Sequence, residues 1–359
     1  MRLNVNRYDL EKLKKYVEEI LVFSGVKNEQ AGPMVDCLVM ADACGIHTHG
    51  LSVLSSHIER IKRGGYNLEK GPKVIKSFPA FTVVDAHNSI GFYSAYKSMA
   101  IAIEKSKIEG VHILFARNCN TYGAAFYFTK MAVDQGLIGI TFCNSPATMP
   151  VYGGVDKLLG SNPFAMGIPC LTRLPILFDM ATSVVAKSKI NEARKNGESI
   201  PLGWALDING EDTTDPIEAI KGIVLPMAGA KGAGISMMID VLAGMLSGAA
   251  YLDEVNKFYS EGNSAMNVGQ VFVSIDPHIV FDDRFYHMVD DYIDKVHASR
   301  TADGTKVRLP GEKKLHKLKT SAAEGVELTE YTVDALEKLG IQYGIQNKLM
   351  DAAVCGGSS

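Results

Sequence analysis

The stretch that decides the fold class is a pair of β-rich runs, Phe81-Thr82-Val83-Val84-Asp85 and Val111-His112-Ile113-Leu114-Phe115, which flank a helical segment at residues 94–109. β-Branched and aromatic residues dominate both runs, which is typical of strands. The segment between them is long enough to cross back over a sheet. This strand–helix–strand order predicts an α/β protein.

The same alternation continues along the chain on both sides of this unit. Upstream the pattern is helical: Asp9 is placed to cap a helix that Gly25 ends, and further helices are expected at about 29–44 and 51–63. Downstream, strands are expected at 137–143, 164–168, 176–179 and 270–275, and helices at about 124–135, 184–196, 234–247, 283–299 and 329–339. The predicted fold class is therefore α/β, mixed with α+β character, with a helical N-terminal region.

Composition limits the class of protein but names no activity. The chain has 359 residues, of which 47% are hydrophobic and 21% charged, with 37 Lys and Arg against 40 Asp and Glu, a formal net charge of −3. That length favours two or three subdomains over a single core. A nucleic-acid binder would usually show a basic excess, so no nucleic-acid partner is expected.

The termini, the longest apolar stretch and the cysteines indicate a compartment. The N-terminus shows no apolar core followed by a cleavage site, which argues against a secretory signal. Residues 234–252 are nearly apolar, but Asp240 interrupts them, so a buried helix is favoured over a membrane span. The six cysteines lack CxxC spacing and favour reduced, buried thiols in a cytoplasmic protein.

Two common nucleotide-binding fingerprints are absent. The sequence has no GxGxxG after a strand and no GxxxxGK[ST], which excludes a Rossmann dinucleotide fingerprint and a P-loop. The nearest Gly-rich element, Gly229-Ala230-Lys231-Gly232-Ala233-Gly234, precedes a helix and reads either as an anion-binding loop or as an ordinary turn. The Leu309–Lys314 segment reads by itself as a surface turn.

The most suggestive stretch for chemistry is Ala41-Asp42-Ala43-Cys44-Gly45-Ile46-His47-Thr48-His49-Gly50. A loop histidine titrates near neutrality and can move a proton at a carbonyl or an alcohol. For His47 we favour a structural role, capping the carbonyls of the preceding helix, whereas for His49 the structural and catalytic roles are evenly matched by spacing. No carboxylate stands at ligand spacing beside the two imidazoles, so no metal site is expected.

Taken together, the motifs resemble those of the type 2 malate/L-lactate dehydrogenases, a family of non-Rossmann NAD(P)-dependent oxidoreductases. Among its members, the segments around 45–50 and 58–67 are most similar to ureidoglycolate dehydrogenase. The resemblance rests on an ordered set of motifs: Ala41-Asp42 through Gly50, Val84-Asp85-Ala86, Arg117-Asn118-Cys119, Gly153-Gly154, Gly160-Ser161-Asn162-Pro163, Asp179-Met180-Ala181-Thr182-Ser183, Pro201-Leu202-Gly203-Trp204-Ala205-Leu206-Asp207, Thr214-Asp215-Pro216, Lys231-Gly232 and Pro310-Gly311-Glu312.

The resemblance implies a fold, an oligomeric state and a cofactor, which is NAD or NADP. It implies an intertwined homodimer and three regions: a helical domain of residues 1–75 with about 305–359, a cofactor-binding α/β domain of 76–121 with about 222–304, and a central α/β domain of 122–221. The positions that match the family's nicotinamide-cofactor contacts are Ser145, Asp179, Met180, Ala181, Lys231, Gly232, Pro310, Gly311 and Glu312.

The resemblance also implies a catalytic pair and an altered substrate pocket. His49 matches a histidine that transfers the proton in part of the family, with Thr48 as its hydroxyl neighbour. Val53 stands where the family commonly has Arg, His57 where it has Tyr, and Thr121 where ureidoglycolate dehydrogenase has a His base. Loss of that Arg removes the natural bidentate partner of a substrate carboxylate, and His57 is then a possible second imidazole.

These features favour an NAD(P)-dependent dehydrogenase or reductase acting on the CH–OH group of a small 2-hydroxy acid, or on its 2-oxo acid, of the malate, lactate or ureidoglycolate type. The alternatives left open are a reductase of cyclic imines or other ketones, a cofactor-binding protein that has lost catalysis, and an enzyme that uses the cofactor for redox-neutral chemistry.

Overall fold

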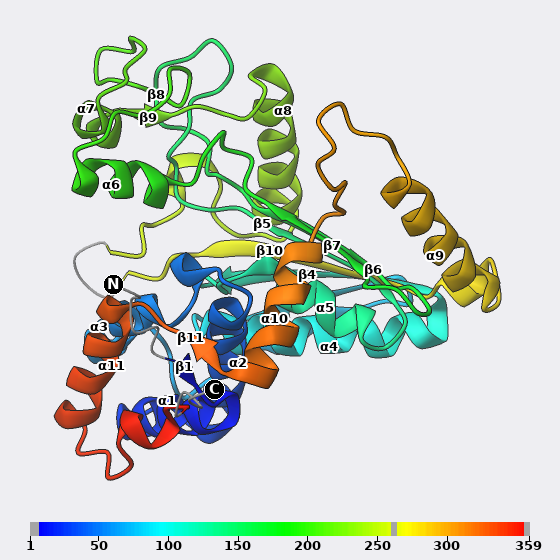
Figure 1. The fold of residues 1–359 in the computed structure, drawn as a ribbon, viewed down its shortest axis with the longest axis horizontal. Coiled ribbons are helices and arrows are strands. Elements are labelled where there is room, and N and C mark those ends of the chain that lie inside the picture. Colours follow the sequence, from blue (N-terminus) through cyan, green and yellow to red (C-terminus); the bar gives the residue numbers. More distant parts are fainter. Residues whose placement is uncertain (1–6, 260–263, 355–359) are drawn as a thin grey trace.

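A seven-stranded mixed sheet runs through the middle of the computed structural model, which describes residues 7–259 and 264–354 (Figure 1). Its strands lie in the order β2 (Lys73–Ser77), β3 (Phe81–Asp85), β4 (Val111–Cys119), β10 (Val268–Ile275), β5 (Ile138–Cys143), β6 (Phe164–Ile168) and β7 (Ile176–Met180). Only β3 and β4 are parallel neighbours, and α4 (Gly91–Glu109) joins them. The predicted strand–helix–strand unit and the mixed α/β class are confirmed.

One face of the sheet packs on helices from the first half of the chain. α4 and α5 (Ala125–Val133) lie directly against the strands, and α2 (Asn28–Ala43) covers them from outside. The strands alternate as expected for a sheet buried on both faces: Phe272 of β10 points into this main core, whereas Val271 and Val273 point to the other face.

The other face of the sheet carries α8 (Ala230–Ile239), which continues into the π-helical turn η3 (Asp240–Met245). Ile239 and Ala243 pack on Val271, but the outward side of this helix is exposed. The helix predicted at 234–247 therefore begins earlier than expected, and the expected burial is found only on the side that faces the sheet. Among the described residues, no helix combines the length and apolarity that crossing a bilayer requires.

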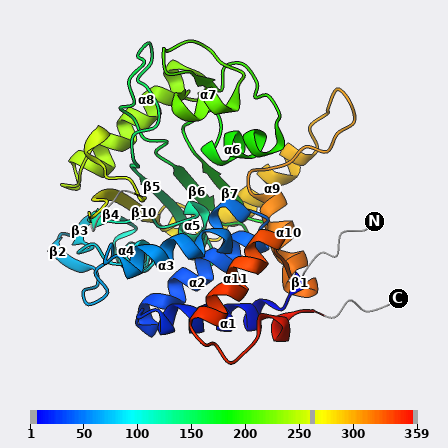
Figure 2. The same ribbon diagram turned by 90° about the vertical axis from the view of Figure 1, so that its left-hand side faces the viewer.

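The N-terminal and C-terminal helices form one layer (Figure 2). Asp9 caps the first helix, as predicted, by accepting from the backbone N–H groups of Glu11 and Lys12. Within this layer α10 packs on α2, α11 packs on α3, and β1 pairs with β11. Its elements are β1 (Arg7–Tyr8), α1 (Leu10–Phe23), η1 (His47–His49), η2 (Leu51–Val53), α3 (Leu54–Lys62), α10 (Glu312–Glu324), β11 (Val326–Glu327), α11 (Glu330–Gln342) and η6 (Leu349–Ala352).

A small lobe beyond the end of the sheet has its own core, built around Val185, Ile190 and Val224. It contains α6 (Lys187–Asn196), β8 (Ala205–Leu206), α7 (Pro216–Lys221) and β9 (Ile223–Val224). The remaining elements are η4 (Leu252–Glu254), η5 (Pro277–Ile279) and α9 (Arg284–His297). The free cysteines Cys37, Cys44, Cys119 and Cys143 are buried and Cys170 is half-buried, while Cys355 lies outside the described residues.

Candidate active site

The segment that carries both candidate histidines is anchored by a buried carboxylate. Asp42 is fully buried near the end of α2, and its Oδ1 lies 2.7 Å from Nδ1 of His47. Its Oδ2 accepts the backbone N–H of Leu51 at 2.6 Å. A Cβ on Gly50 would lie 2.3 Å from this carboxylate, so the backbone approaches it where only glycine fits. Asp42 therefore fixes the segment on both sides of His49.

His47 has a structural role, but its partner differs from the one predicted. It pairs with the Asp42 side chain rather than with carbonyls at the end of α2, because the turn η1 brings the ring back over that helix. The hydrogen bond with Asp42 raises the pKa of His47, and burial raises the pKa of Asp42. Both shifts favour retention of the proton, which suits an anchor rather than a group that exchanges protons with substrate.

His49 stands at the rim of the site, with the Thr48 hydroxyl oxygen 3.1 Å from its Nδ1. The side chain keeps access to solvent, yet surrounding protein desolvates the ring enough to lower its pKa. The Asp179 carboxylate opposes this shift and the Lys314 ammonium adds to it. His49 is therefore neutral at pH 7 and lies within electrostatic range of two groups from distant parts of the chain.

Asp179 is the penultimate residue of β7 and joins three elements. Its Oδ2 accepts the backbone N–H of Phe126 at the start of α5, at 3.1 Å, and lies 3.9 Å from Nζ of Lys314 on α10. The Lys314 ammonium also stands over the Phe126 ring, 4.9 Å from its centroid. Asp179 thus caps the start of α5.

The Pro310-Gly311-Glu312 segment is bound to the same strand. The Pro310 carbonyl accepts the Leu177 N–H at 3.0 Å, and Gly311 has φ 86° and packs so closely on Leu177 that a Cβ would lie 2.6 Å from its carbonyl oxygen. Gly311 precedes α10, and the Glu312 side chain turns back to accept the Leu309 N–H and to meet His297. The expected surface turn is therefore the N-terminus of a helix docked on β7.

Ser145 belongs to a hydrogen-bonded cluster at the ends of β5 and β6. The side-chain oxygen Oδ1 of Asn162 accepts the Ser145 backbone N–H at 2.9 Å and the Ser145 hydroxyl at 3.3 Å. The Asn162 amide in turn donates to the carbonyl of Ser236 on α8. Ser145 is thereby tied to the helix whose first turn contains Lys231.

The first turn of α8 holds Lys231 and Gly232, so these residues are helical rather than part of a loop. Lys231 is exposed, and a Cβ on Gly232 would lie 2.2 Å from the Met227 carbonyl oxygen. The backbone of Thr182, directly after Met180 and Ala181, bonds to Ser161 and Met227. A continuous chain of hydrogen bonds therefore connects the end of β7 with the start of α8.

His57 lies in a buried aromatic cage. Its exposed fraction is 4%, its Nδ1 is 2.7 Å from the Tyr66 hydroxyl, and the rings of Phe92 and Phe258 meet its edge. Burial lowers the pKa of His57 to about 3, so it stays neutral at physiological pH. The expectation of a second titrating imidazole at this position does not fit this environment.

Val53 and Thr121 flank this cage from two sides. Val53 is half-buried one turn before His57 and packs on the main core. Thr121 is half-buried, and its carbonyl lies so close to Gly91 at the start of α4 that a Cβ there would be 2.0 Å away. Neither residue is hydrogen-bonded to His49, whose partners among the described residues are Thr48 and the Ile46 carbonyl.

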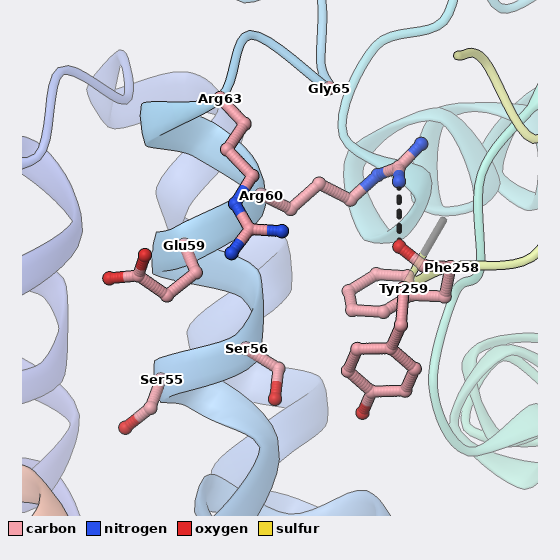
Figure 3. A pocket seen from close by; sticks show the side chains of 8 residues that line it. All are labelled: Ser55, Ser56, Glu59, Arg60, Arg63, Gly65, Phe258 and Tyr259. Atoms are coloured by element: carbon pink, nitrogen blue, oxygen red, sulfur yellow. Dashed lines mark hydrogen bonds between the residues drawn. The ribbon is translucent and has the colours of Figure 1, made fainter. Parts of the chain in front are cut away.

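A pocket on the exposed side of α3 holds none of the predicted site residues. The pocket is lined by Ser55, Ser56, Glu59 and Arg63 from α3 and the residue after it, and by the rings of Phe258 and Tyr259, which lie on the same side of the helix as Ser56 in Figure 3. Arg60 extends across to donate to the Phe258 carbonyl at 2.9 Å (Figure 3). Its guanidinium also donates to the Asn120 side chain and to the Ser264 carbonyl. Arg60 thus ties α3 to two other segments.

Among residues 7–259 and 264–354, no three His, Cys, Asp or Glu side chains are grouped as a metal site.

Sequence reasoning missed Asp42 as the anchor, Asn162 as the partner of Ser145, and Lys314. The signal for Asp42 was present: it is a carboxylate on a helix whose neighbouring positions Leu38, Val39 and Ala41 are all core residues.

Comparison with known proteins identifies the chain. The model of the malate/L-lactate dehydrogenase family matches residues 8–337. Ureidoglycolate dehydrogenase (NAD(+)) of Escherichia coli O157:H7 is 35% identical over 322 residues, 89% of this chain and 92% of the relative. (2R)-3-sulfolactate dehydrogenase (NADP(+)) of Chromohalobacter salexigens is 30% identical, covering 88% and 93%. The structure of malate dehydrogenase from Pyrococcus horikoshii OT3 superimposes with a TM-score of 0.87 at 31% identity, covering 96% and 97%.

These matches define the class of protein as an oxidoreductase of CH–OH donors that uses NAD or NADP. The chain belongs to the malate/L-lactate dehydrogenase family.

Proposed function

We propose that the chain transfers a hydride between NAD(P) and a small 2-hydroxy acid or its 2-oxo acid, with His49 as the proton-transferring residue. The observation that carries this proposal is the convergence of three segments: His49 lies in electrostatic range of Asp179 at the end of β7 and of Lys314, which follows the Pro310–Glu312 segment. A titrating group and the candidate cofactor residues therefore meet at one place.

The residues present suit a nicotinamide cofactor. Lys231 offers an exposed cation for phosphate, and the Ser145 hydroxyl and the Asp179 carboxylate are half-buried groups that can bond amide or hydroxyl groups. Tight backbone packing at Gly232 and Gly311 fixes the two helix starts that would border it. When bound, the cofactor accepts or delivers the hydride. Ser145, Asp179–Ala181, Lys231–Gly232 and Pro310–Glu312 hold and orient it.

The remaining task for the protein is the proton. Neutral His49 accepts the proton of the substrate hydroxyl during oxidation and returns it to the carbonyl oxygen during reduction. The Thr48 hydroxyl, 3.1 Å from Nδ1, orients the imidazole. We propose that Val53, His57 and Thr121, the positions where this chain differs from the family, shape its substrate preference, with the buried His57 acting through the packing around it.

We expect NADH or NADPH to bind with a Kd that rises about tenfold in Lys231→Ala, because a charge-assisted hydrogen bond contributes about 1.5–3 kcal/mol. Nicotinamide fluorescence titration measures this effect, with Lys189→Ala on α6 as the control for loss of an exposed cation. An unchanged Kd in Lys231→Ala would remove Lys231 from the cofactor site.

Turnover by the same preparation separates the remaining alternatives. Oxidation of malate, lactate or ureidoglycolate with NAD or NADP supports the proposal. Tight cofactor binding without turnover across 2-hydroxy acids, ketones and cyclic imines would instead indicate a binding protein. Product formation with no net change in the oxidation state of the cofactor would indicate redox-neutral chemistry.

We propose that the chain is a homodimer whose interface includes the exposed side of α8 and η3. Met238 and Leu246 are 57% and 59% exposed, and a contiguous apolar surface of this kind is unusual on a monomer. The exposed apolar residues on this side are Met237, Met238, Val241, Leu242, Met245 and Leu246.

Sedimentation equilibrium should therefore give twice the chain mass of 38.9 kDa. The double variant Leu242→Asp/Leu246→Asp should sediment as a monomer, because four charges would be buried at a symmetric interface. Ile108→Asp, at an isolated exposed position on α4, is the control and should remain dimeric. A monomeric wild-type protein would contradict the proposal.

We further propose three functional regions, formed by residues 1–75 with about 305–359, 76–121 with about 222–304, and 122–221. We propose a cytoplasmic location, which the free thiols at Cys37, Cys119 and Cys143 support because such thiols persist in a reducing compartment. The net charge of −3 supports small molecules rather than nucleic acid as partners.

A further inference from the structure

A pocket of about 550 Å³ lies between the end of α2 and the start of α10. Four cationic side chains line it, Arg308, Lys313, Lys314 and Lys317, and no carboxylate does. We call it the basic pocket. Gly45 and Gly311, with φ of 76° and 86°, form part of its wall and leave backbone accessible to a ligand.

Two of the four charges are balanced from outside the pocket. Lys317 pairs with Glu327, and Lys314 lies 3.9 Å from Asp179. Arg308 and Lys313 are exposed, and neither has an ion pair with another described residue. About two positive charges therefore remain uncompensated, which creates a potential that attracts an anion.

The position of these lysines is unfavourable for the helix itself. Lys313 and Lys314 lie in the first turn of α10, directly after its N-terminal Glu312. The helix macrodipole is positive at this end and favours anionic rather than cationic side chains. Placing two lysines in this turn, with Arg308 just before it, lowers stability unless an anion joins them. A contribution to folding therefore does not explain the arrangement, whereas a bound anion does.

We propose that the basic pocket is a binding site for an oxyanionic group, a phosphate or a carboxylate, carried by a ligand of the dehydrogenase site. Gly311 belongs to the candidate cofactor residues, and Lys314 lies within electrostatic range of His49, so the pocket adjoins both cofactor and substrate. The oxyanion is either the 2′-phosphate of NADP or a second acidic group on the hydroxy acid. The proposal rests on the proposed function. The pocket would supply a cation for a substrate acid group, the role that the family's Arg has at the position where this chain has Val53.

Binding of inorganic phosphate, measured by isothermal titration calorimetry at low ionic strength, tests the pocket without cofactor or turnover. In Arg308→Ala/Lys313→Ala the Kd for phosphate should rise about tenfold or more, because charge-assisted hydrogen bonds are lost. The control Lys319→Ala/Lys338→Ala removes the same charge from exposed positions on α10 and α11 and should stay within about twofold. Equal phosphate affinity in both double variants would overturn the proposal.

Two further readouts identify the source of the oxyanion. If it is the cofactor phosphate, Arg308→Ala/Lys313→Ala weakens NADPH but leaves NADH unchanged. If it is a substrate acid group, the variant raises the KM for malate but not for lactate. No change in either comparison would overturn the link to the dehydrogenase site. A wild-type protein that binds phosphate but neither NADH nor NADPH would contradict the proposed function instead.

Discussion

His49→Ala is expected to lower turnover about a hundredfold or more, the usual contribution of a positioned acid–base group. The variant removes the one exposed imidazole that the structure places within range of Asp179 and Lys314. Because His49 moves a proton and does not hold the cofactor, the Kd for NADH or NADPH should change little. Single-turnover formation of reduced nicotinamide from saturated enzyme measures the effect on the chemical step.

The pH profile gives a second signature of His49. Burial lowers its pKa from the ordinary 6.5, so the neutral base is the predominant form at pH 7. As pH falls through this lowered pKa, His49 becomes protonated, and oxidation of the hydroxy acid should slow while reduction gains its proton donor. This acid limb should disappear in His49→Ala. The control is His287→Ala on α9, an exposed histidine that should leave the limb intact. An identical limb in His49→Ala would exclude His49 as the base.

Asp42→Ala is expected to cause the largest loss of stability, about 1–3 kcal/mol, because it removes a fully buried hydrogen-bond acceptor from two donors. The change leaves His47 and the Leu51 N–H without the partners that they hold at 2.7 and 2.6 Å. The segment that carries His49 is then anchored only at its ends, so turnover should fall as well. Urea unfolding monitored by circular dichroism measures the free energy.

The difference in the free energy of unfolding between the wild-type protein and Asp42→Ala should depend on pH, and the sign of this dependence follows from the pKa of His47. The Asp42 hydrogen bond raises the pKa of His47 above its ordinary 6.5. Protonated His47 therefore contributes stability that is fully present below pH 6.5 and is lost as pH rises through the raised pKa. Asp36→Ala, an exposed carboxylate on the same helix, is the matched control. Equal losses in Asp42→Ala and Asp36→Ala would show that the buried carboxylate is not the anchor.

Local patterns predicted most of the fold because they are strong where elements are long and buried. The runs at 81–85 and 111–115 became β3 and β4, and Asp9 caps α1 as expected. The helix α10 was missed because its sequence is charged and follows a Pro-Gly pair, both of which are typical of a turn. Its stability comes from docking on β7 and α2, which local sequence does not reveal.

The candidate site was predictable in its residue types but not in its connections. The two histidines attracted attention through their chemistry, yet only tertiary packing shows that Asp42 anchors His47 and that His57 is enclosed by aromatic rings. Asp179 and Lys314 are far apart in sequence, so no spacing rule connects them. The cofactor residues came from the family resemblance, and their convergence required the sheet order around β7.

The most direct measurement of the central claim is a crystal structure of the protein with oxidised NADP and a 2-oxo acid bound, a pair that cannot react with each other. The account predicts that the cofactor contacts Ser145, Asp179, Lys231 and Gly311, and that the 2-oxo group lies within hydrogen-bonding distance of His49. A cofactor bound away from these residues, or a substrate carbonyl out of reach of His49, would contradict it.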